Sequence, residues 1–424
     1  MRGGFGYDDA TAALRRALTF GMDPSLGPIG AMCDALGRPQ DAYACVQVAG
    51  SNGKSSTARM IAALLAAHGL RVGLYTSPHL VRYPERIELD GAPVDDATFA
   101  AGIAAALDAA DACGVQATEF ELLTAAALWT FAQAGVEVAV LECGLGGRWD
   151  ATTIADARVA ALTGIALEHT AVLGDTLELI AAEKACIIKP GAVAVLADGI
   201  AAAGVFEQRA ADVGARVVYA SARQADEHAD ALAHLPRYQR ANAATALAAA
   251  RELLGRPLDF SRTALALASV VVPGRFETLR ERPLLMVDAA HNPQSAAVLA
   301  DELARKFVTA NMSADVARER AAAGASPVPT LLLGVLADKD VHGVVDALAP
   351  VFERIVVTQS SSPRAKPAER LADIVADVTG SRPAVAASVP RALELLDGRP
   401  AIATGSITLA GEVKRVFGAR IGAQ

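Results

Sequence analysis

The sequence predicts an α/β protein of two domains, the first built on a parallel-rich sheet flanked by helices and the second a smaller, Rossmann-like, doubly wound unit. Three observations lead to this prediction. Apolar, β-prone runs alternate with alanine-rich helical stretches through most of the 424 residues. An early strand runs through a glycine turn into a helix, as in a βαβ unit. The alternation begins afresh after the run Val-Val-Val-Pro-Gly that ends at Gly274.

The first domain, residues 1–272, opens with two short amphipathic helices and then alternates strands with helices. Its expected helices are 8–20, 28–36, 57–68, 95–113, 118–134, a segment capped at Asp175 or Thr176 and ending before Pro190, and 238–255. Its expected strands are 43–49, 72–75, 136–141 and 158–162, and residues 192–220 are predicted as strand, helix and strand. These lengths suit crossover helices over a parallel sheet.

Residues 273–283 are predicted as a linker, and residues 284–424 as the second domain. Strands are expected at 284–287, 330–333, 355–358, 384–386 and 401–404. Helices are expected after Pro293, at 341–349, 367–378 and 390–396, and up to 417. Residues 309–327 interrupt this pattern and carry no functional assignment.

Composition excludes several functions. A net charge of −8, a pI of 5.5 and 4% aromatic residues argue against a nucleic-acid surface. The chain shows neither a signal peptide nor an apolar stretch of membrane-spanning length. Its five scattered cysteines contain no C-x-x-C pair, which is typical of reduced thiols. We therefore expect a cytoplasmic protein that binds no membrane.

The turn Gly50-Ser51-Asn52-Gly53-Lys54-Ser55-Ser56 has the layout of a phosphate-binding loop. Glycines allow close approach of the backbone to an anion, and the following helix directs free N–H groups at it. Lys54 adds a positive charge, and a serine hydroxyl can bind Mg²⁺. An ordinary strand-to-helix turn is the alternative. The sequence favours a P-loop-type ATPase domain that uses Mg²⁺ and a nucleotide.

Three further charged groups follow in the first domain. Glu142 ends a buried strand, where a nucleotide site places its metal-side carboxylate. His169 lies in a loop, and Lys184 lies on a helix face beside Ile180. From composition alone, His169 and Lys184 are better explained as a loop histidine and a solvated helix charge.

Nine motifs occur along the chain in this order: Gly-Ser-Asn-Gly-Lys-Ser-Ser, Thr-Ser-Pro-His-Leu, Glu-Arg-Ile, Phe-Glu-x-Leu-Thr, Glu-x-Gly-Leu-Gly-Gly-Arg-x-Asp-Ala-Thr, Glu-Lys-x-x-Ile-Ile-Lys, Pro-Gly-Arg-Phe-Glu, Asp-x-Ala-His-Asn-Pro and Thr-Gly-Ser. Together they resemble the folylpolyglutamate synthase/dihydrofolate synthase family of Mur-ligase-like, ATP-dependent ligases. The resemblance implies that ATP phosphorylates a pterin carboxylate and that the amine of L-glutamate then attacks the acyl phosphate. Dihydropteroate and folates are the implied acid substrates, in a cleft between the domains.

The resemblance also implies roles for individual residues. Gly50, Ser51, Asn52, Gly53, Lys54, Ser55, Ser56, Asn242, Arg275, Asp288 and His291 would bind ATP. Ser56 and Glu142 would bind one Mg²⁺ and His169 a second, with Lys184 carbamylated beside them; Lys54, Glu142, His169 and Lys184 would be the catalytic residues. Thr76, Ser77, Pro78, His79, Phe120 and Glu121 would line the pterin cleft.

Ser55 stands where the family usually has Gly, and it competes with Ser56 as the metal-side hydroxyl. A bifunctional enzyme of bacterial type is the first hypothesis. The alternatives are a monofunctional folylpolyglutamate synthase, a Mur-type ligase with a UDP-sugar substrate, and a nucleotide-binding regulator. A monomer is expected, because no apolar helix face remains uncovered.

Overall fold

The computed structural model describes residues 4–18, 24–307, 328–396 and 398–421. It is an α/β structure that divides into two compact units, Met1–Val271 and Val272–Gln424. The predicted fold class is confirmed, since each unit contains its own parallel-rich sheet. Residues 309–327, and the end of the helix predicted at 8–20, lie outside the described residues.

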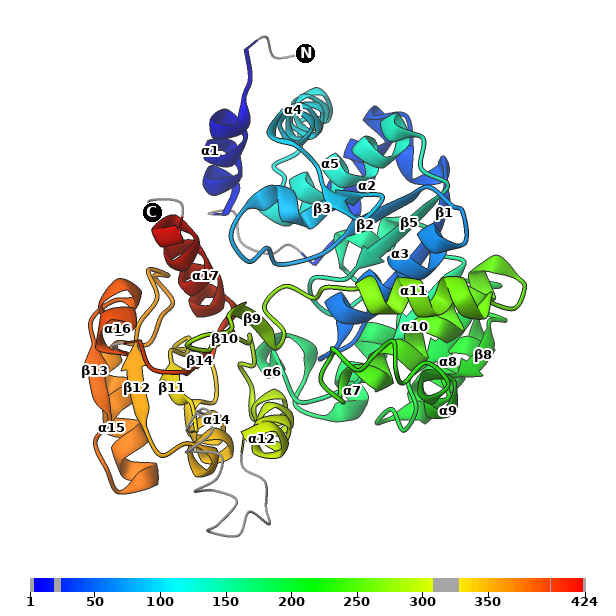
Figure 1. Cartoon of the computed structure of the whole chain (residues 1–424). Helices are drawn as coiled ribbons and strands as arrows, with labels where there is room; N and C mark the ends of the chain where they lie inside the picture. Colours follow the sequence, from blue (N-terminus) through cyan, green and yellow to red (C-terminus); the bar gives the residue numbers. More distant parts are fainter. Residues whose placement is uncertain (1–3, 19–23, 308–327, 397, 422–424) are drawn as a thin grey trace. The chain divides into compact units, whose positions relative to one another are not determined.

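The first unit contains an eight-stranded sheet with the order β4-β3-β2-β5-β1-β6-β7-β8 (Figure 1). The six strands from β2 to β8 in this order are parallel, while β3 and β4 add an antiparallel edge. The bounds are β1 (Ala44–Ala49), β2 (Val72–Tyr75), β3 (Ile87–Leu89), β4 (Ala92–Pro93), β5 (Val138–Glu142), β6 (Val159–Leu162), β7 (Val193–Leu196) and β8 (Arg216–Tyr219). The short edge strands β3 and β4 were not predicted from the sequence.

Some helices of this unit begin at a residue whose side chain accepts a hydrogen bond from a backbone N–H of the first turn. Thr176 accepts a hydrogen bond from the Leu179 N–H and so starts α7, one of the two alternatives expected for that cap. The helices are α1 (Tyr7–Ala17), α2 (Gly27–Ala35), α3 (Lys54–Ala67), α4 (Asp96–Cys113), α5 (Glu119–Ala134), α6 (Thr170–Leu173), α7 (Leu177–Ala185), α8 (Ala203–Asp212), α9 (Ala222–Asp226), α10 (Gln239–Leu254) and α11 (Phe260–Ser269). Sequence patterning missed α6, α9 and α11.

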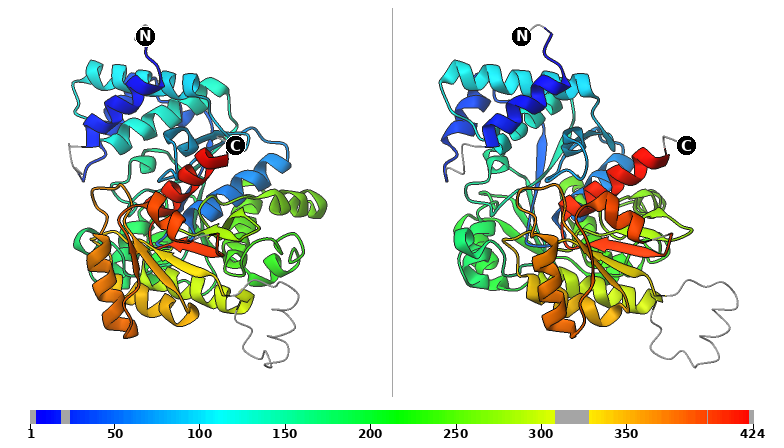
Figure 2. Two further views of the ribbon diagram at one scale, coloured as in Figure 1. Left: turned by 60° about the vertical axis from the view of Figure 1, so that its left-hand side comes forward. Right: turned by 90° about the vertical axis from the view of Figure 1, so that its left-hand side faces the viewer.

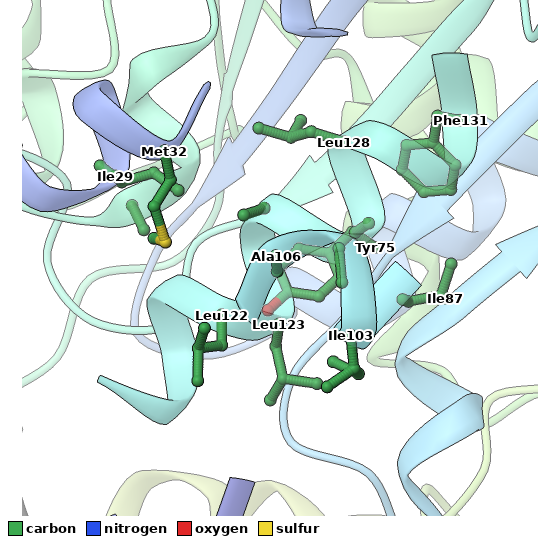
Figure 3. Close-up of a cluster of buried hydrophobic side chains, with 14 of the residues drawn as sticks. Ile29, Met32, Tyr75, Ile87, Ile103, Ala106, Leu122, Leu123, Leu128 and Phe131 are labelled. Atoms are coloured by element: carbon green, nitrogen blue, oxygen red, sulfur yellow. The ribbon is translucent and has the colours of Figure 1, made fainter. Parts of the chain in front are cut away.

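Every second residue of a strand points to the same face of the sheet. On one face of this sheet, these residues form two apolar cores with the helices that cover them. Figure 3 shows part of the larger core, in which Tyr75, Ile103, Leu123 and Phe131 meet between β2, α4 and α5. Both views of Figure 2 show α1 lying along α4. The second core joins β6 and β7 to α7 and α8. These layers leave the carboxyl ends of the parallel strands to carry the loops discussed below.

The second unit contains a six-stranded sheet with the order β13-β12-β11-β14-β10-β9. Its strands are β9 (Glu277–Arg280), β10 (Leu285–Val287), β11 (Thr330–Leu333), β12 (Ile355–Thr358), β13 (Ala384–Ala386) and β14 (Ala401–Thr404). Its helices include α12 (Pro293–Phe307), α14 (Val341–Leu348), α15 (Ala368–Thr379), α16 (Val389–Leu395) and α17 (Ile407–Ile421). Within the described part of the chain, no helix combines the length and apolarity needed to cross a membrane.

The segment 273–283, predicted as a linker, differs from that expectation. It contains β9, which pairs antiparallel with β10 and forms the edge of the second sheet. The antiparallel pairing returns the chain directly onto its own sheet, and Lys414 from α17 forms an ion pair with Glu277 at 2.6 Å. These residues are therefore part of the second unit's fold.

Candidate active site

The candidate site of the first unit lies at the carboxyl ends of four neighbouring parallel strands, β2, β5, β1 and β6. Ligands of open α/β sheets bind at this edge, because loops from adjacent strands converge there. The parallel register sets Val48 of β1 beside Glu142 of β5, and Ala49 beside Leu162 of β6. The turn after β1 thus lies between the turns that follow β5 and β6.

The phosphate-binding loop Gly50–Gly53 is held by the segment that follows β6. The Ser51 N–H donates to the Gly164 carbonyl at 2.7 Å, and the Thr163 hydroxyl donates to the Asn52 carbonyl at 2.7 Å. The Ser51 hydroxyl donates to the Ala166 carbonyl and accepts from the Ala166 N–H. These contacts use a backbone N–H, a carbonyl and a side chain of the loop, and they fix its shape before any ligand binds.

Both glycines of this loop are needed for close approach. A Cβ at Gly50 would lie 1.8 Å from the Thr163 hydroxyl oxygen, and one at Gly53 would lie 2.3 Å from Asn242 Oδ1. Gly53 also has φ +87° as the residue preceding α3, a conformation that glycine adopts at little cost. The loop is therefore packed against α10 on one side and against Thr163, which directly follows β6, on the other.

Lys54 and Lys184 both bond to this loop. The Lys54 ammonium donates to the carbonyls of Gly50 at 2.8 Å and Ser51 at 3.2 Å. The Lys184 ammonium, on α7, donates to the same Gly50 carbonyl at 3.0 Å and to Glu168 Oε1 at 3.1 Å. The structure thus brings Lys184 from a helix far along the chain to the phosphate loop, where composition alone suggested a solvated charge.

Burial changes the protonation of these groups. Lys184 is 2% exposed, and its burial, assisted by the nearby Lys54 charge, lowers its pKa. Burial by itself would raise the pKa of Glu168, but Lys54 and Lys184 outweigh it and bring that pKa below its ordinary value. The pair therefore combines an ionised carboxylate with an amine that deprotonates more readily than a surface lysine.

Glu142 is held by two donors from different loops. The Ser55 hydroxyl donates to Oε1 at 2.7 Å, and the Ser77 N–H donates to Oε2 at 3.1 Å. Burial raises the pKa of Glu142, while Lys54, Ser55 and Ser77 act in the opposite direction. A buried carboxylate oxygen and a hydroxyl beside a phosphate loop are the hard oxygen ligands that Mg²⁺ prefers. The residues present therefore fit a divalent cation.

Ser55, and not Ser56, is the hydroxyl that contacts Glu142. Ser56 is 3% exposed and points to α10, where its hydroxyl oxygen accepts a hydrogen bond from Gln239 Nε2 at 3.1 Å. Gln239 Oε1 in turn accepts from Asn242 Nδ2 at 2.8 Å. The prediction that Ser56 faces the metal side of the loop thus differs from the observed geometry, because the two serines lie on different sides of α3.

His169 precedes α6 in a left-handed conformation, with φ +48° and ψ +36°, and its side chain is exposed. It neighbours Glu168, which reaches Lys184. Among the described residues, no three His, Cys, Asp or Glu side chains gather as a metal cluster. Mg²⁺ commonly uses one or two carboxylates with substrate phosphates and water, so a site based on Glu142 needs no such cluster.

Comparison with known proteins identifies the family. The model for the Mur ligase middle domain matches residues 48–245. The dihydrofolate synthase/folylpolyglutamate synthase of Mycobacterium tuberculosis is 35% identical, over 94% of this chain and 91% of its own. The chain belongs to the dihydrofolate synthase/folylpolyglutamate synthase family. The family and fold predicted from the sequence are thereby confirmed.

Other proteins with related names are also similar to this chain over most of its length. The folylpolyglutamate synthase of Lacticaseibacillus casei is 33% identical, over 90% of this chain and 92% of its own. The chain spans about half the length of two further relatives whose names add dihydropteroate synthase.

Two solved structures match almost the whole chain. The M. tuberculosis folylpolyglutamate synthase complexed with ADP has a TM-score of 0.84 and 32% identity, covering 97% of this chain and 99% of its own. The Yersinia pestis bifunctional enzyme complexed with AMPPNP and Mn has a TM-score of 0.80 and 28% identity, covering 97% and 98%.

The loop after β2 and the start of α5 were predicted to line the pterin cleft of this family. The structure ties the loop residues Thr76–His79 to the site through Ser77 and Glu142. The Phe120 ring lies 6.0 Å from the Tyr75 ring and so close to Gly144 that a Cβ there would be 2.8 Å away. Phe120 therefore covers the glycine turn that follows β5.

Glu121 has a structural role that was not predicted, while its place in the pterin cleft stays a prediction. Its Oε2 accepts hydrogen bonds from the Thr118 N–H and the Thr118 hydroxyl, both at 2.8 Å, which closes a capping box at the start of α5. Only 7% of Glu121 is exposed. The carboxylate thus stabilises the helix that presents Phe120, because it satisfies donors at that helix's first turn.

Asp150 is a site-building residue that sequence reasoning missed. Its Oδ2 accepts from the N–H groups of Gly144 at 2.7 Å and Leu145 at 2.9 Å, and its Oδ1 accepts from the Thr152 N–H and hydroxyl. It therefore folds the turn directly after Glu142. The available signal was an acidic residue at the end of a glycine-rich run, which commonly receives backbone N–H groups.

The predicted nucleotide residues of the second unit lie around the end of β10. Asp288 is 4% exposed; its Oδ2 accepts from the Phe276 N–H and its Oδ1 from the Ala290 N–H, both at 2.8 Å. His291 Nδ1 contacts the Ala289 carbonyl at 2.9 Å, and Arg275 donates to the Gly274 carbonyl at 3.1 Å. Asp288 thus fixes the turn that carries Arg275. The nucleotide roles of these three residues stay predictions.

Proposed function

We propose that the chain is an ATP-dependent ligase that joins L-glutamate to dihydropteroate and to reduced folates through an acyl-phosphate intermediate. The observation that carries this proposal is the convergence of Lys54, Ser55, Glu142 and Lys184 around one phosphate loop. It occurs in a chain matched over nearly its full length by enzymes with these two names. Both the bifunctional activity and the substrates follow from that family membership.

The chemistry explains why the site needs these groups. A carboxylate is a poor electrophile because its leaving group would be oxide, and phosphorylation supplies a better one. The phosphate loop and Lys54 bind and orient the nucleotide phosphates, and they offset negative charge on the transferring phosphoryl group. The buried backbone contacts of the loop keep its donors in place, so little rearrangement is needed when ATP binds.

Glu142 and Ser55 would hold the divalent metal ion. When bound, such an ion neutralises phosphate charge and acts as a Lewis acid. The two hydrogen bonds to Glu142, from Ser55 and Ser77, orient its oxygens. The proposal includes a second Mg²⁺ beside His169. It replaces the metal-binding role predicted for Ser56 with a positioning role, in which Ser56 holds the first turn of α3 through Gln239.

Lys184 is proposed to be carbamylated. Its amine would attack CO₂, forming a nitrogen–carbon bond and releasing one proton, and the product is an anionic carbamate. Burial favours the reaction, because the lowered pKa of Lys184 increases the fraction of this side chain that is present as the neutral, nucleophilic amine. The resulting anion would lie beside Lys54 and the metal side of the phosphate loop.

The test is ADP release by the purified protein. With dihydropteroate, glutamate, ATP and Mg²⁺, ADP should form only when all four are present, and the same should hold when tetrahydrofolate replaces dihydropteroate. The Lys54→Ala protein is the matched control. Absence of ADP with either acid substrate would refute the proposal.

A monofunctional folylpolyglutamate synthase is the second candidate, because a relative of almost equal length carries only that name. Turnover with tetrahydrofolate but not with dihydropteroate would select it. A monomeric state and a cytoplasmic location stay predictions; light scattering on the purified chain would measure the first.

A further inference from the structure

The loop between β2 and β3, residues Thr76–Arg86, is a closed excursion from the sheet. The Thr76 N–H donates to the Arg86 carbonyl at 3.0 Å, directly after the Tyr75–Ile87 pair of the two strands. Its first turn is tied to the active site, since the Ser77 N–H reaches Glu142. The loop therefore starts and ends at fixed points and begins at the metal-side carboxylate.

Glu85 organises the interior of this loop. Its carboxylate accepts hydrogen bonds from three consecutive backbone N–H groups, those of Leu80 at 2.8 Å, Val81 at 3.1 Å and Arg82 at 2.7 Å. Consecutive N–H groups that converge in this way form an anion-binding nest, and here the anion is part of the loop itself. Because residues 80–82 are held by Glu85, the backbone that follows His79 is fixed.

Arg86 determines how His79 is protonated. Arg86 Nε lies 3.0 Å from His79 Nδ1, and only 7% of Arg86 is exposed. A guanidinium group can only donate, so Nδ1 must accept and cannot carry a proton. The neutral ring then has its proton on Nε2. Burial and the Arg86 charge agree with this, because they lower the pKa of His79 to about 3.

Tyr83 keeps the ring in this orientation. Its ring centroid is 4.3 Å from that of His79 and 5.6 Å from the Arg86 guanidinium carbon. Its hydroxyl donates to Glu119 Oε1 at 2.5 Å, which ties the loop to the first residue of α5. The next residue of that helix is Phe120, which covers the turn after Glu142. The His79 ring thus lies in a network that links both loops of the proposed pterin cleft.

We propose that His79 binds the acid substrate, by donating a hydrogen bond from Nε2 to a carboxylate or acyl-phosphate oxygen, and that Arg86 is a positioning residue that fixes His79 in this tautomer. The proposal rests on the ligase function proposed above. Within the described part of the chain, Nε2 of His79 forms no hydrogen bond, and this side chain is half-buried. A neutral donor suits this place, since it binds an anion without competing with the divalent metal for Glu142.

The tautomer is tested on the substrate-free protein by NMR. Protein labelled with ¹⁵N-histidine should show His79, assigned by loss of its signals in His79→Gln, as a neutral ring protonated at Nε2 from pH 5 to pH 8. In Arg86→Met the ring should populate both tautomers or titrate near its usual pKa. A wild-type ring protonated at Nδ1, or one that titrates near pH 6.5, would overturn the proposal.

The binding role is tested by steady-state kinetics. The amide nitrogen of glutamine can reach the place of Nε2, whereas that of asparagine reaches only the place of Nδ1. His79→Asn should raise the KM for the pterin acid about ten- to a hundredfold, the loss expected for a hydrogen bond to a charged oxygen. His79→Gln should regain most of this, and the KM for ATP should stay unchanged.

The matched control is Arg82→Gln, on the same loop, which removes an exposed ion pair with Asp96 and a cation–π contact with the Tyr7 ring but leaves His79, Tyr83 and Arg86 in place. It should leave every kinetic constant unchanged. Equal losses in His79→Asn and His79→Gln would show a structural role and refute the binding role. If even the wild type forms no product, the ligase function and the binding role both fail, whereas the NMR measurement still decides whether Arg86 fixes the tautomer.

Discussion

Gly53→Ala is the substitution whose effect follows most directly from the geometry. The new Cβ would lie 2.3 Å from Asn242 Oδ1, and the residue would keep a φ of +87°. The left-handed backbone costs a non-glycine residue about 1–2 kcal/mol. To make room, Asn242 must turn away and lose its 2.8 Å bond to Gln239, worth about 0.5–1.5 kcal/mol. The alanine offsets roughly 0.4–1 kcal/mol by restricting the unfolded chain.

The net expectation is a free energy of unfolding lowered by about 1–3 kcal/mol, together with weaker nucleotide binding. Urea titration followed by circular dichroism measures the first quantity, and calorimetric titration with ADP measures the second. The stability and the nucleotide affinity both depend on this turn, because Gly53 shapes the phosphate loop and also directly precedes α3.

A double-mutant cycle separates the two contributions. In the Asn242→Ala background the close contact disappears while the backbone cost remains, so Gly53→Ala should lower stability by about 0.5–1.5 kcal/mol less than in the wild type. Gly37→Ala is the control; Gly37 has φ +79° with open space around its Cβ position, so it tests the backbone cost alone. Equal effects of Gly53→Ala in both backgrounds would refute the contact between the loop and α10.

The remaining predictions concern the charged groups of the first unit. Lys54→Ala should abolish ATP turnover, since the phosphates lose their main charge partner, and near-normal turnover would contradict the loop assignment. Lys184→Ala should lose activity and regain part of it with added short carboxylic acids; full activity without rescue would exclude the carbamate. Ser55→Ala should raise the Mg²⁺ concentration needed for half-maximal activity about tenfold, as expected for one hydrogen bond to a charged group, whereas Ser56→Ala should leave it nearly unchanged. His79 is neutral when folded down to about pH 3 but has a pKa of 6.5 when unfolded, so its contribution to stability is complete above pH 6.5 and is lost as the pH falls towards 3. The urea-derived free energy of unfolding should therefore fall less steeply over this range in His79→Gln than in the wild type, and identical slopes would contradict the lowered pKa.

The sequence by itself determined the order of most strands and helices and the positions of the main chemical groups. Alternating apolar runs and alanine-rich stretches are local patterns, and β2, β11, β12, β13 and β14 have the predicted bounds. The turn Gly50–Lys54 was also recognisable, because glycine, lysine and serine next to a helix start carry their function within a few residues. Glu142 could be placed for the same reason, as the last residue of an apolar run.

Only the tertiary structure decided which of these groups meet. Ser55 and Ser56 are adjacent in sequence, but successive residues of an α-helix point in directions about 100° apart, and the packing of α3 against β5 and α10 decides that Ser55 faces Glu142. Lys184 is 134 residues from Gly50, and only the docking of α7 turns an apparent surface charge into a buried partner of the loop.

Two further features of the structure, the strand β9 and the role of Glu121, were also not predicted. β9 consists of only four residues at a sheet edge, so its pairing with β10 leaves little periodic signal, and the segment was predicted as a linker. Thr118-x-x-Glu121 is the sequence signature of a capping box, and the structure shows that the Glu121 carboxylate closes it, a role that the assignment of Glu121 to the cleft did not include. Local patterns specify where a side chain lies along the chain, whereas its partner is set by the packing of elements that are distant in sequence, and this packing assembles the site.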